Sequence, residues 1–393
     1  MHKIKAVHLS ALLRSTAGKV LRTHPRLHSL AEAADNYRGA IHHSLAAIVP
    51  GLIRPTPRKL TVAITAHCNL RCTGCRYGRD FMPGHQLSLE MVCDLLDDAK
   101  AAGIRTVRLY GGEPLLHPDL PKMIRHARNR GLSAYVTTNG TLLKQKFDAL
   151  YQAGLRDLTI GYYGTGENYD DYVHRPRQFK RVEDGVAAVR DRYGPLVKMQ
   201  LNYLIMRPTC NLPALRQAWS FAKRYDLSFH TDLIHYSLPY FTEGPDRELQ
   251  FRPSDRKDIV TFVAELARLK EEDPERVKDS FPGLFSIPDW LTLGSHMRVP
   301  CDARKLIWVG ADGTVQLCYV TFKLGNLHSM RLKDMLFNPN HANAARDAFL
   351  LNCPNCHCER DSRVQRHMPS RRAYRQFRAT QERSVVPDRE PAE

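Results

Sequence analysis

Short apolar runs alternate with longer amphipathic stretches through the middle of the chain. The runs at positions 60–65, 106–110, 134–137, 157–161, 199–205 and 228–233 are typical of buried strands. Between them, apolar residues recur at helical spacing over 89–101, 120–130, 142–153, 181–192 and 212–224. Such alternation indicates parallel βαβ units, arranged as an open sheet or a barrel. Right-handed crossovers would place the loops that follow the strands on one common face, where chemistry is expected to gather.

The two ends of the chain follow other patterns. Residues 1–58 are basic and helical in pattern, and the prolines within 54–58 end that pattern. Helical signals at 254–272 begin a connection, and the segments 306–309 and 314–319 flank a glycine-containing turn that predicts a β-hairpin. The last residues are rich in Arg, Ser, Gln and Pro, so we expect a basic, flexible tail that is disordered or only locally helical. The expected divisions are 1–58, 59–250, 251–298, 299–360 and 361–393.

Three cysteines follow the first strand directly. Cys68, Cys72 and Cys75 form a C-x3-C-x2-C pattern, which can occupy three corners of a cubane cluster and leave the fourth iron open to a chelating small molecule. Structural zinc normally takes four ligands, often in paired C-x2-C sets, so zinc fits this spacing less well. A catalytic thiol needs one cysteine and a base, not three cysteines at fixed intervals.

This segment resembles the cluster-binding loop of the radical S-adenosylmethionine (radical SAM) superfamily. The Gly-Gly-Glu-Pro segment at 111–114, after the second strand, looks like the glycine-rich motif of that family. The resemblance implies an α/β protein with a partial (β/α)6 barrel, a [4Fe–4S] cluster with an open iron site, and S-adenosylmethionine as cofactor. It also implies reductive cleavage of that cofactor to a radical that takes hydrogen from a substrate C–H bond. A flavodoxin- or ferredoxin-type protein would donate the electron.

The same resemblance implies which residues bind the cofactor. Glu113 would bind the methionine ammonium, Arg175 its carboxylate, and Asn202 the ribose. The segment at 138–140 resembles one that faces the cofactor, although a strand-ending Asn-Gly turn explains it equally well. The residue before the third cysteine is commonly aromatic in the family but is Gly74 here, so Tyr77 is expected to substitute for it beside adenine. The expected cofactor-binding residues are Tyr77, Gly111, Gly112, Glu113, Pro114, Thr138, Asn139, Arg175 and Asn202.

A second cysteine group lies near the expected hairpin. Cys301 and Cys318 flank the hairpin, and Cys353, Cys356 and Cys358 follow it. Their spacing alone permits zinc or an iron–sulfur cluster. Given the first motif, the arrangement resembles twitch, a shortened relative of the SPASM domain, and implies one auxiliary [4Fe–4S] cluster. We expect Cys301, Cys318, Cys353 and Cys356 to be ligands, with Cys358 as a spare or a substitute.

Candidate catalytic residues lie where the sixth strand ends. His230, Asp232 and His235 are there, and Tyr319 follows an expected cluster ligand. One of them would act as a base if the substrate is oxidised with the auxiliary cluster as electron acceptor. The favoured reaction is therefore oxidation, dehydrogenation or C–X bond formation on a natural-product small molecule. Peptide modification and radical epimerisation are the alternatives within the family.

Composition adds a strong basic bias. The chain carries 58 Lys and Arg against 41 Asp and Glu, and residues 1–59 hold ten basic and two acidic residues. This excess fits a solvated surface, or a peripheral contact with a membrane or an anionic partner. A non-catalytic zinc- or nucleic-acid-binding protein is the rival from another class, but RNA-binding motifs are absent from the sequence. The sequence has neither a secretory signal pattern nor an apolar run of membrane-spanning length, which predicts a cytoplasmic protein.

Overall fold

The computed structural model describes residues 41, 44–46, 48–77, 82–235, 248–318 and 321–367. Its strands are β1 (Lys59–Thr65), β2 (Thr106–Gly111), β3 (Ser133–Thr138), β4 (Asp157–Tyr162), β5 (Lys198–Ile205), β6 (Ser228–Leu233), β7 (Leu306–Val309), β8 (Thr314–Gln316) and β9 (Lys323–Asn326). Its α-helices are α3 (Leu89–Ala101), α4 (Leu120–Asn129), α5 (Leu143–Gln152), α6 (Glu167–Tyr172), α7 (Gln178–Tyr193), α8 (Leu212–Arg224), α9 (Arg256–Glu272), α10 (Phe281–Phe285), α11 (Ile287–Leu293), α12 (Leu332–Met335), α13 (Pro339–Leu350) and α14 (Arg360–Arg366). Within the described part of the chain, no helix is long and apolar enough to cross a membrane.

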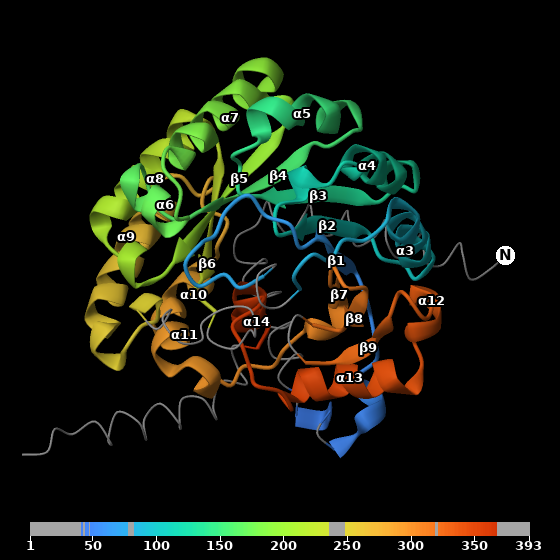
Figure 1. Cartoon of the computed structure of the whole chain (residues 1–393). Coiled ribbons are helices and arrows are strands. Elements are labelled where there is room, and N and C mark those ends of the chain that lie inside the picture. The colour runs from blue at the N-terminus through green and yellow to red at the C-terminus, as the bar shows by residue number, and fades with distance from the viewer. Residues whose placement is uncertain are drawn as a thin grey trace, which may run out of the picture.

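One curved sheet organises the molecule. The strand order is β6-β5-β4-β3-β2-β1-β7-β8-β9, and β1 to β6 are parallel. The sheet does not close on itself, and helices α3 to α9 cover its outer face (Figure 1). This arrangement confirms the predicted α/β class and the partial barrel. Because β1 to β6 run in one direction, their carboxyl ends meet at one edge of the sheet.

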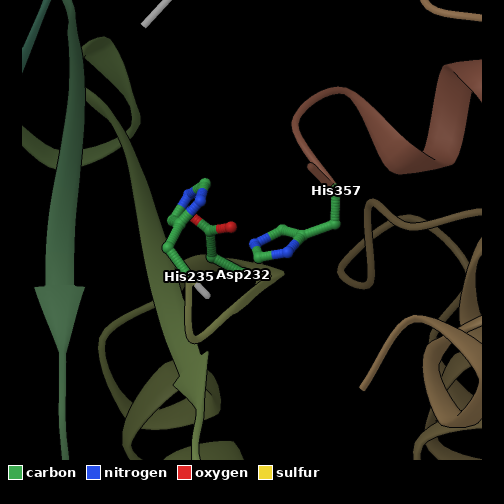
Figure 2. A group of neighbouring side chains, drawn as sticks. All are labelled: Asp232, His235 and His357. Atoms are coloured by element: carbon green, nitrogen blue, oxygen red, sulfur yellow. The ribbon is translucent and has the colours of Figure 1, made fainter. Parts of the chain in front are cut away.

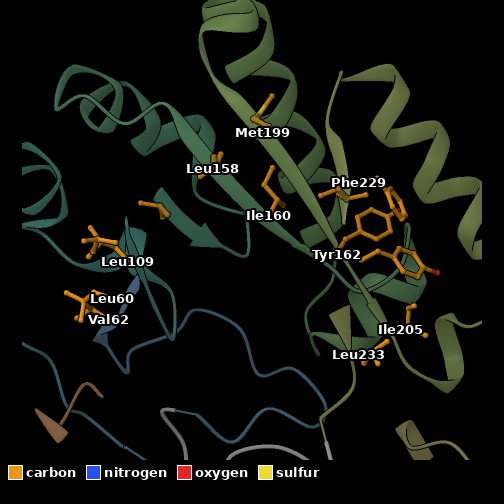
Figure 3. Packing of buried hydrophobic residues seen from close by; sticks show 14 of the residues in the cluster. Leu60, Val62, Leu109, Leu158, Ile160, Tyr162, Met199, Ile205, Phe229 and Leu233 are labelled. Carbon is orange, nitrogen blue, oxygen red and sulfur yellow. The ribbon is translucent and has the colours of Figure 1, made fainter. Parts of the chain in front are cut away.

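The burial pattern of the strands explains which side chains face inward. In β5 and β6, fully buried residues alternate with partly exposed ones, as expected for strands with two different faces. The buried set packs against the outer helices, where Met199, Ile205, Phe229 and Leu233 join the main core (Figure 3). The partly exposed set, which includes Asn202, His230 and Asp232, therefore faces the inside of the curve.

The predicted hairpin extends the barrel sheet. β7 and β8 pair antiparallel as expected, but β7 also pairs in parallel with β1, with Lys59 opposite Leu306. The sequence pattern predicts residues 299–360 as a division apart from 59–250 and gives no indication of this pairing. It satisfies the backbone groups along the second side of β1, which would otherwise be an edge strand. Ile307 and Val309 of β7 belong to the same core as Leu60 and Val62 of β1.

The start of the expected tail is locally helical, but this helix is buried rather than flexible. Residues 361–366 continue from Arg360 as α14, and Arg363 and Val364 within it are fully buried. Arg363 donates hydrogen bonds to the carbonyl oxygens of Val299 and Pro300, so α14 is tied to the cysteine region. The composition misled because these arginines bind backbone carbonyls inside the protein rather than water. The expectations for residues 1–40 and 368–393 lie outside the described residues.

Shared packing of β7 and β1 predicts that the hairpin unfolds together with the barrel. Ile307 is fully buried, so Ile307→Ala should lower the free energy of unfolding by about 2–5 kcal/mol through lost contacts and a cavity. Urea unfolding followed by both circular dichroism and tryptophan fluorescence should shift as one transition. Lys323→Ala, at an exposed position of β9, is the matched control and should change the midpoint little. A shift confined to one of two separate transitions would contradict the single core.

Candidate functional site

The first cysteine loop is held in place by backbone contacts. It leaves the carboxyl end of β1, and its cysteines are all partly buried. Thr73 donates its N–H to the Tyr172 carbonyl at 2.8 Å, and Arg175 Nη1 donates to the Asn69 carbonyl at 2.7 Å. The Leu70 N–H points at Cys68 Sγ at 3.4 Å. Hydrogen bonds to the segment after β4 thus fix the loop after β1, which carries the three thiols.

Glu113 is the buried link between this loop and the sheet. Its side chain is fully buried and accepts hydrogen bonds from Leu115 N at 3.0 Å, Thr138 Oγ1 at 2.7 Å and Asn139 N at 2.8 Å. Its own N–H donates to the His67 carbonyl at 2.8 Å. Burial raises the pKa of Glu113 to about 7, against the opposing effect of the three donors. A carboxylate offers about four lone-pair sites, so these donors leave about one for a ligand.

The glycines before Glu113 allow the backbone of β2 to approach the cysteine loop. A Cβ on Gly112 would lie 2.3 Å from the His67 carbonyl oxygen, and one on Gly111 would lie 2.1 Å from that of Thr65. Gly111 also has a φ of +151°. Both contacts are with backbone atoms, which cannot rotate away. The glycines are therefore required by the close packing of two chain segments, whatever else they contact.

Three more of the residues expected to bind the cofactor, Asn139, Pro114 and Tyr77, lie around the same loop. Asn139 Nδ2 donates to Asn69 Oδ1 at 3.0 Å and lies 4.0 Å from Cys68 Sγ. Pro114 is buried at the start of a 3-10 turn. Tyr77 is buried in a small second core with Trp308 and Ala311, and its hydroxyl accepts from Ala311 N at 3.3 Å. Tyr77 thus anchors the end of the loop to the C-terminal region.

Two tyrosines beside the cysteine loop were not anticipated. Tyr163, just after β4, packs against Tyr172 with ring centroids 4.9 Å apart. Burial raises the pKa of Tyr163, and the nearby thiols of the first loop add to the shift. The sequence signal that could have indicated Tyr163 is the Gly-Tyr-Tyr-Gly segment at 161–164, which lies at the carboxyl end of a parallel strand.

A charged cluster lies behind the inner face of β6. Asp279 is fully buried and lies 3.2 Å from His230 Nδ1 and 2.6 Å from Arg360 Nη2. Burial opposes ionisation of Asp279, but His230 and Arg360 outweigh it and hold the pKa of that carboxyl well below its usual range. About a third of the His230 side chain remains exposed. Neither Asp279 nor Arg360 was anticipated, because both lie far from β6 in the sequence.

The end of β6 meets the second cysteine group through a histidine. His357, between Cys356 and Cys358, has its Nε2 3.0 Å from the carbonyl oxygen of Leu233. Its ring lies 4.2 Å from that of His235, centroid to centroid. Figure 2 shows both rings beside the Asp232 carboxylate. Asp232 and His235 were expected near one another, but His357 was missed, and Tyr319 lies outside the described residues.

The second cysteine group surrounds one cavity. Its lining includes all the cysteines of this group, Cys301, Cys318, Cys353, Cys356 and Cys358. Cys301, Cys353 and Cys356 each accept a hydrogen bond from the backbone N–H two residues further on, as Cys68 does in the first loop. The thiol of Cys358 hydrogen-bonds to Cys356, which lowers the pKa of Cys356 to about 6 and raises that of Cys358.

The chain is similar to a known protein family and to curated members of it. The model of the Radical SAM superfamily matches residues 62–207. A GTP 3',8-cyclase of Chlorobaculum tepidum is 33% identical over 259 residues, covering 62% of this chain and 76% of the relative. The chain belongs to the radical SAM superfamily. Members of this family use a [4Fe–4S] cluster and S-adenosylmethionine, which confirms the cofactor prediction at the level of the family.

Two further relatives carry two different names, GTP 3',8-cyclase and heme synthase. A GTP 3',8-cyclase of Marinobacter nauticus is 28% identical and covers 72% of this chain and 83% of the relative. An AdoMet-dependent heme synthase of Methanosarcina barkeri is 27% identical and covers 67% of this chain and 74% of the relative. The solved structure of native anSMEcpe with bound AdoMet has a TM-score of 0.59 at 18% identity, covering 84% of this chain and 99% of that one. At that identity, the structural likeness shows the fold alone.

Close packing at Gly112 predicts that a methyl group there disturbs the cysteine loop. Gly112→Ala would press Cβ against the His67 and Ala66 carbonyl oxygens, so we expect a loss of at least half of the iron bound by the first loop. Iron would be counted after anaerobic reconstitution. Gly51→Ala, where the added methyl meets nothing within 4 Å, is the control and should retain iron. Equal iron in both variants would contradict this role of Gly112.

Burial of Glu113 predicts a pH-dependent stability difference. In the folded protein the pKa of Glu113 is about 7, above the ordinary glutamate value of 4.5, so the stability that it contributes is present below pH 4.5 and is lost as the pH rises to about 7. In Glu113→Gln this dependence disappears, although one of the backbone N–H groups now facing the amide is left unpaired at a cost of about 1–3 kcal/mol.

The free energy of unfolding should therefore be compared between wild type and Glu113→Gln from pH 5 to pH 8. The disadvantage of the variant should shrink with rising pH, by up to about 3 kcal/mol over the whole window. Glu167→Gln, at an exposed position, should run parallel to wild type. A constant gap between Glu113→Gln and wild type would show that Glu113 is ionised throughout.

Proposed function

We propose that this radical SAM enzyme oxidises or dehydrogenates a small polar substrate, with a second iron–sulfur cluster beside the substrate chamber. The observation that carries the proposal is the pair of cysteine sites. Both contain thiols that accept N–H hydrogen bonds from the residue two positions on. Such N–H···S bonds are typical of cluster ligands, since they offset the negative charge of thiolate sulfur.

Cys68, Cys72 and Cys75 hold the cluster that binds S-adenosylmethionine. When bound, cluster and cofactor supply the reductive chemistry by which the enzyme takes hydrogen from its substrate. The chain positions the cofactor: Asn139 and Arg175 lie against the loop, and Arg175 has further N–H donors for a carboxylate. Glu113 has lone-pair capacity left for an ammonium, and Asn202 on the inner face of β5 is the ribose contact.

Cys301, Cys318, Cys353 and Cys356 hold the auxiliary cluster. Cys358 is the spare thiol, because it shares its hydrogen bond with Cys356. Arg363 supports this site: its guanidinium donates to the carbonyl oxygens of Val299, Pro300, Cys356 and Cys358. The divisions of the chain that we propose remain an N-terminal extension over 1–58, the barrel over 59–250, a connection over 251–298 and the cluster region over 299–360, with α14 added to the last.

The substrate chamber lies inside the curve of the sheet. Its wall is polar: Arg108 donates to Thr137 at 2.9 Å, Asn202 faces inward from β5, and His230 faces inward from β6. His230 is the residue proposed to take up the substrate proton, since its ring is partly exposed and Asp279 orients it from behind. A polar wall favours a small hydrophilic substrate over a lipid. An electron donor of flavodoxin or ferredoxin type completes the partners.

A second candidate function is conversion of GTP. It is supported by the 33% identity to the GTP 3',8-cyclase of Chlorobaculum tepidum. The inward guanidinium of Arg108, stacked over Tyr110 at 4.8 Å, offers a positive charge for an anionic substrate. Incubation of the reduced enzyme with GTP and S-adenosylmethionine, followed by mass spectrometry, separates the two candidates. Consumption of GTP in step with 5′-deoxyadenosine would replace the oxidation proposal.

The proposal predicts two clusters and cleavage of the cofactor. Anaerobic reconstitution should give about eight irons per chain, and strong reductant with S-adenosylmethionine should give 5′-deoxyadenosine. Cys72→Ala should retain about four irons and lose at least 99% of the cleavage, because its open-site cluster cannot assemble. Cys353→Ala should lose iron but retain cleavage. Cys93→Ala, on α3 outside both groups, is the control.

Two results would overturn parts of this proposal. About four irons in wild type, with normal cleavage, would remove the auxiliary cluster and with it the preference for oxidation. Zinc instead of iron in the wild-type protein, without cleavage, would contradict the proposal that both cysteine sites hold iron–sulfur clusters.

A further inference from the structure

We propose that Asp232, His235 and His357 bind a divalent transition-metal ion that is separate from both iron–sulfur sites. Each residue offers one ligand atom, and the three atoms all lie within 4.8 Å of one another. Two imidazoles and one carboxylate form a ligand set used for mononuclear Fe²⁺ and, with similar donors, for Zn²⁺. In this set the chain provides three protein ligands and leaves the remaining positions for water or substrate.

The fold brings these ligands together from two distant segments. Asp232 is on β6 and His235 directly follows it, whereas His357 comes from the loop of the second cysteine group. Figure 2 shows the Asp232 carboxylate between the two imidazole rings, with a ring nitrogen of His357 directed toward it. Ligands bound at about 2.1 Å to a tetrahedral ion are about 3.4 Å apart. The three ligand atoms, which lie within 4.8 Å of one another, would therefore each have to approach the others by at most about 1.4 Å to close around an ion.

Neighbouring groups orient the proposed ligands. Asp232 Oδ1 accepts from Leu233 N at 3.0 Å, and Asp232 Oδ2 lies 3.5 Å from Asn202 Nδ2. The Leu233 carbonyl oxygen, 3.0 Å from His357 Nε2, adds an oxygen donor at the same place. Adjacent ligands of an octahedral ion with 2.1 Å bonds are about 3.0 Å apart, so both atoms could serve one ion. A simple hydrogen bond from His357 to Leu233 would explain that contact but not the approach of Asp232 and His235.

An ion here would act on the substrate rather than on S-adenosylmethionine. The site is at the carboxyl end of β6, at the edge of the sheet where the first cysteine loop also lies, and its ligands border the inner face through Asp232. A metal with open positions can bind a substrate oxygen or nitrogen and lower its pKa. The chemistry thus identifies a ligand class, a substrate with an oxygen or nitrogen donor near the reacting carbon.

The experiment uses the reconstituted enzyme with its clusters in place. Mn²⁺, which avoids thiolate sites, would be titrated anaerobically while the free-ion EPR signal is recorded, and Zn²⁺ would be measured by mass spectrometry with iron in the same samples. We expect one saturable site per chain. Asp232→Asn and His235→Gln should each weaken binding at least tenfold with unchanged iron content. His328→Gln, at an exposed position, is the matched control and should bind as wild type.

His357→Gln provides a further comparison. Its neighbours Cys356 and Cys358 line the second cysteine cavity, so iron content and the EPR spectrum of the auxiliary cluster are measured alongside. Weaker Mn²⁺ binding with intact clusters supports the site. Absence of saturable Mn²⁺ and Zn²⁺ binding in wild type, or binding that Asp232→Asn and His235→Gln leave unchanged, would overturn it. Neither the metal-binding measurement nor the iron measurement depends on S-adenosylmethionine cleavage. Failure of the proposed metal site is therefore distinguishable from failure of the proposed function.

Discussion

The buried carboxyl group of Glu113 is the contact on which the site depends. It receives donors from the end of β3 and from the turn after β2, while its own N–H holds the first cysteine loop. Removing a carboxyl group from water is costly unless it is neutral or surrounded by donors. Here both solutions operate, since three donors face a group whose pKa is raised to about 7. Glu113 thereby joins three segments, the first cysteine loop, the turn after β2 and the end of β3, in one buried set of hydrogen bonds.

A buried and fully hydrogen-bonded charged group also holds the second cysteine group, but here the group is a positively charged guanidinium. Arg363 is fully buried, and its guanidinium is satisfied by backbone carbonyl oxygens and by the ring of Trp290, 4.8 Å away. Arg360 completes the arrangement from the same helix by pairing with Asp279 behind β6. The rigid fork of a guanidinium can hold several carbonyls at once, which an ammonium cannot do as well. Two arginines of α14 therefore join the cysteine region to the barrel.

The inside of the curved sheet combines these two sites. The parallel strands bring all their carboxyl ends to one edge, so the first cysteine loop after β1 and the polar residues at the end of β6 lie at the same edge of the sheet. The second cysteine group reaches the same edge through His357, which contacts Leu233 although 124 residues separate them. Two cysteine sites at one edge of the sheet, beside polar residues of its inner face, fit the radical chemistry of the superfamily, in which the cofactor reacts and the protein positions it.

The sequence by itself determined the six parallel strands, the hairpin and both cysteine groups, because periodicity and cysteine spacing are local signals. It also indicated Asp232 and His235, which follow from the end of β6. Only the tertiary structure decided that β7 pairs with β1, that α14 is buried, and that His357 lies against His235. Each of these is a contact between segments far apart in the chain, and burial changes what a residue does: an arginine that composition assigns to solvent becomes a structural donor when carbonyl oxygens surround it.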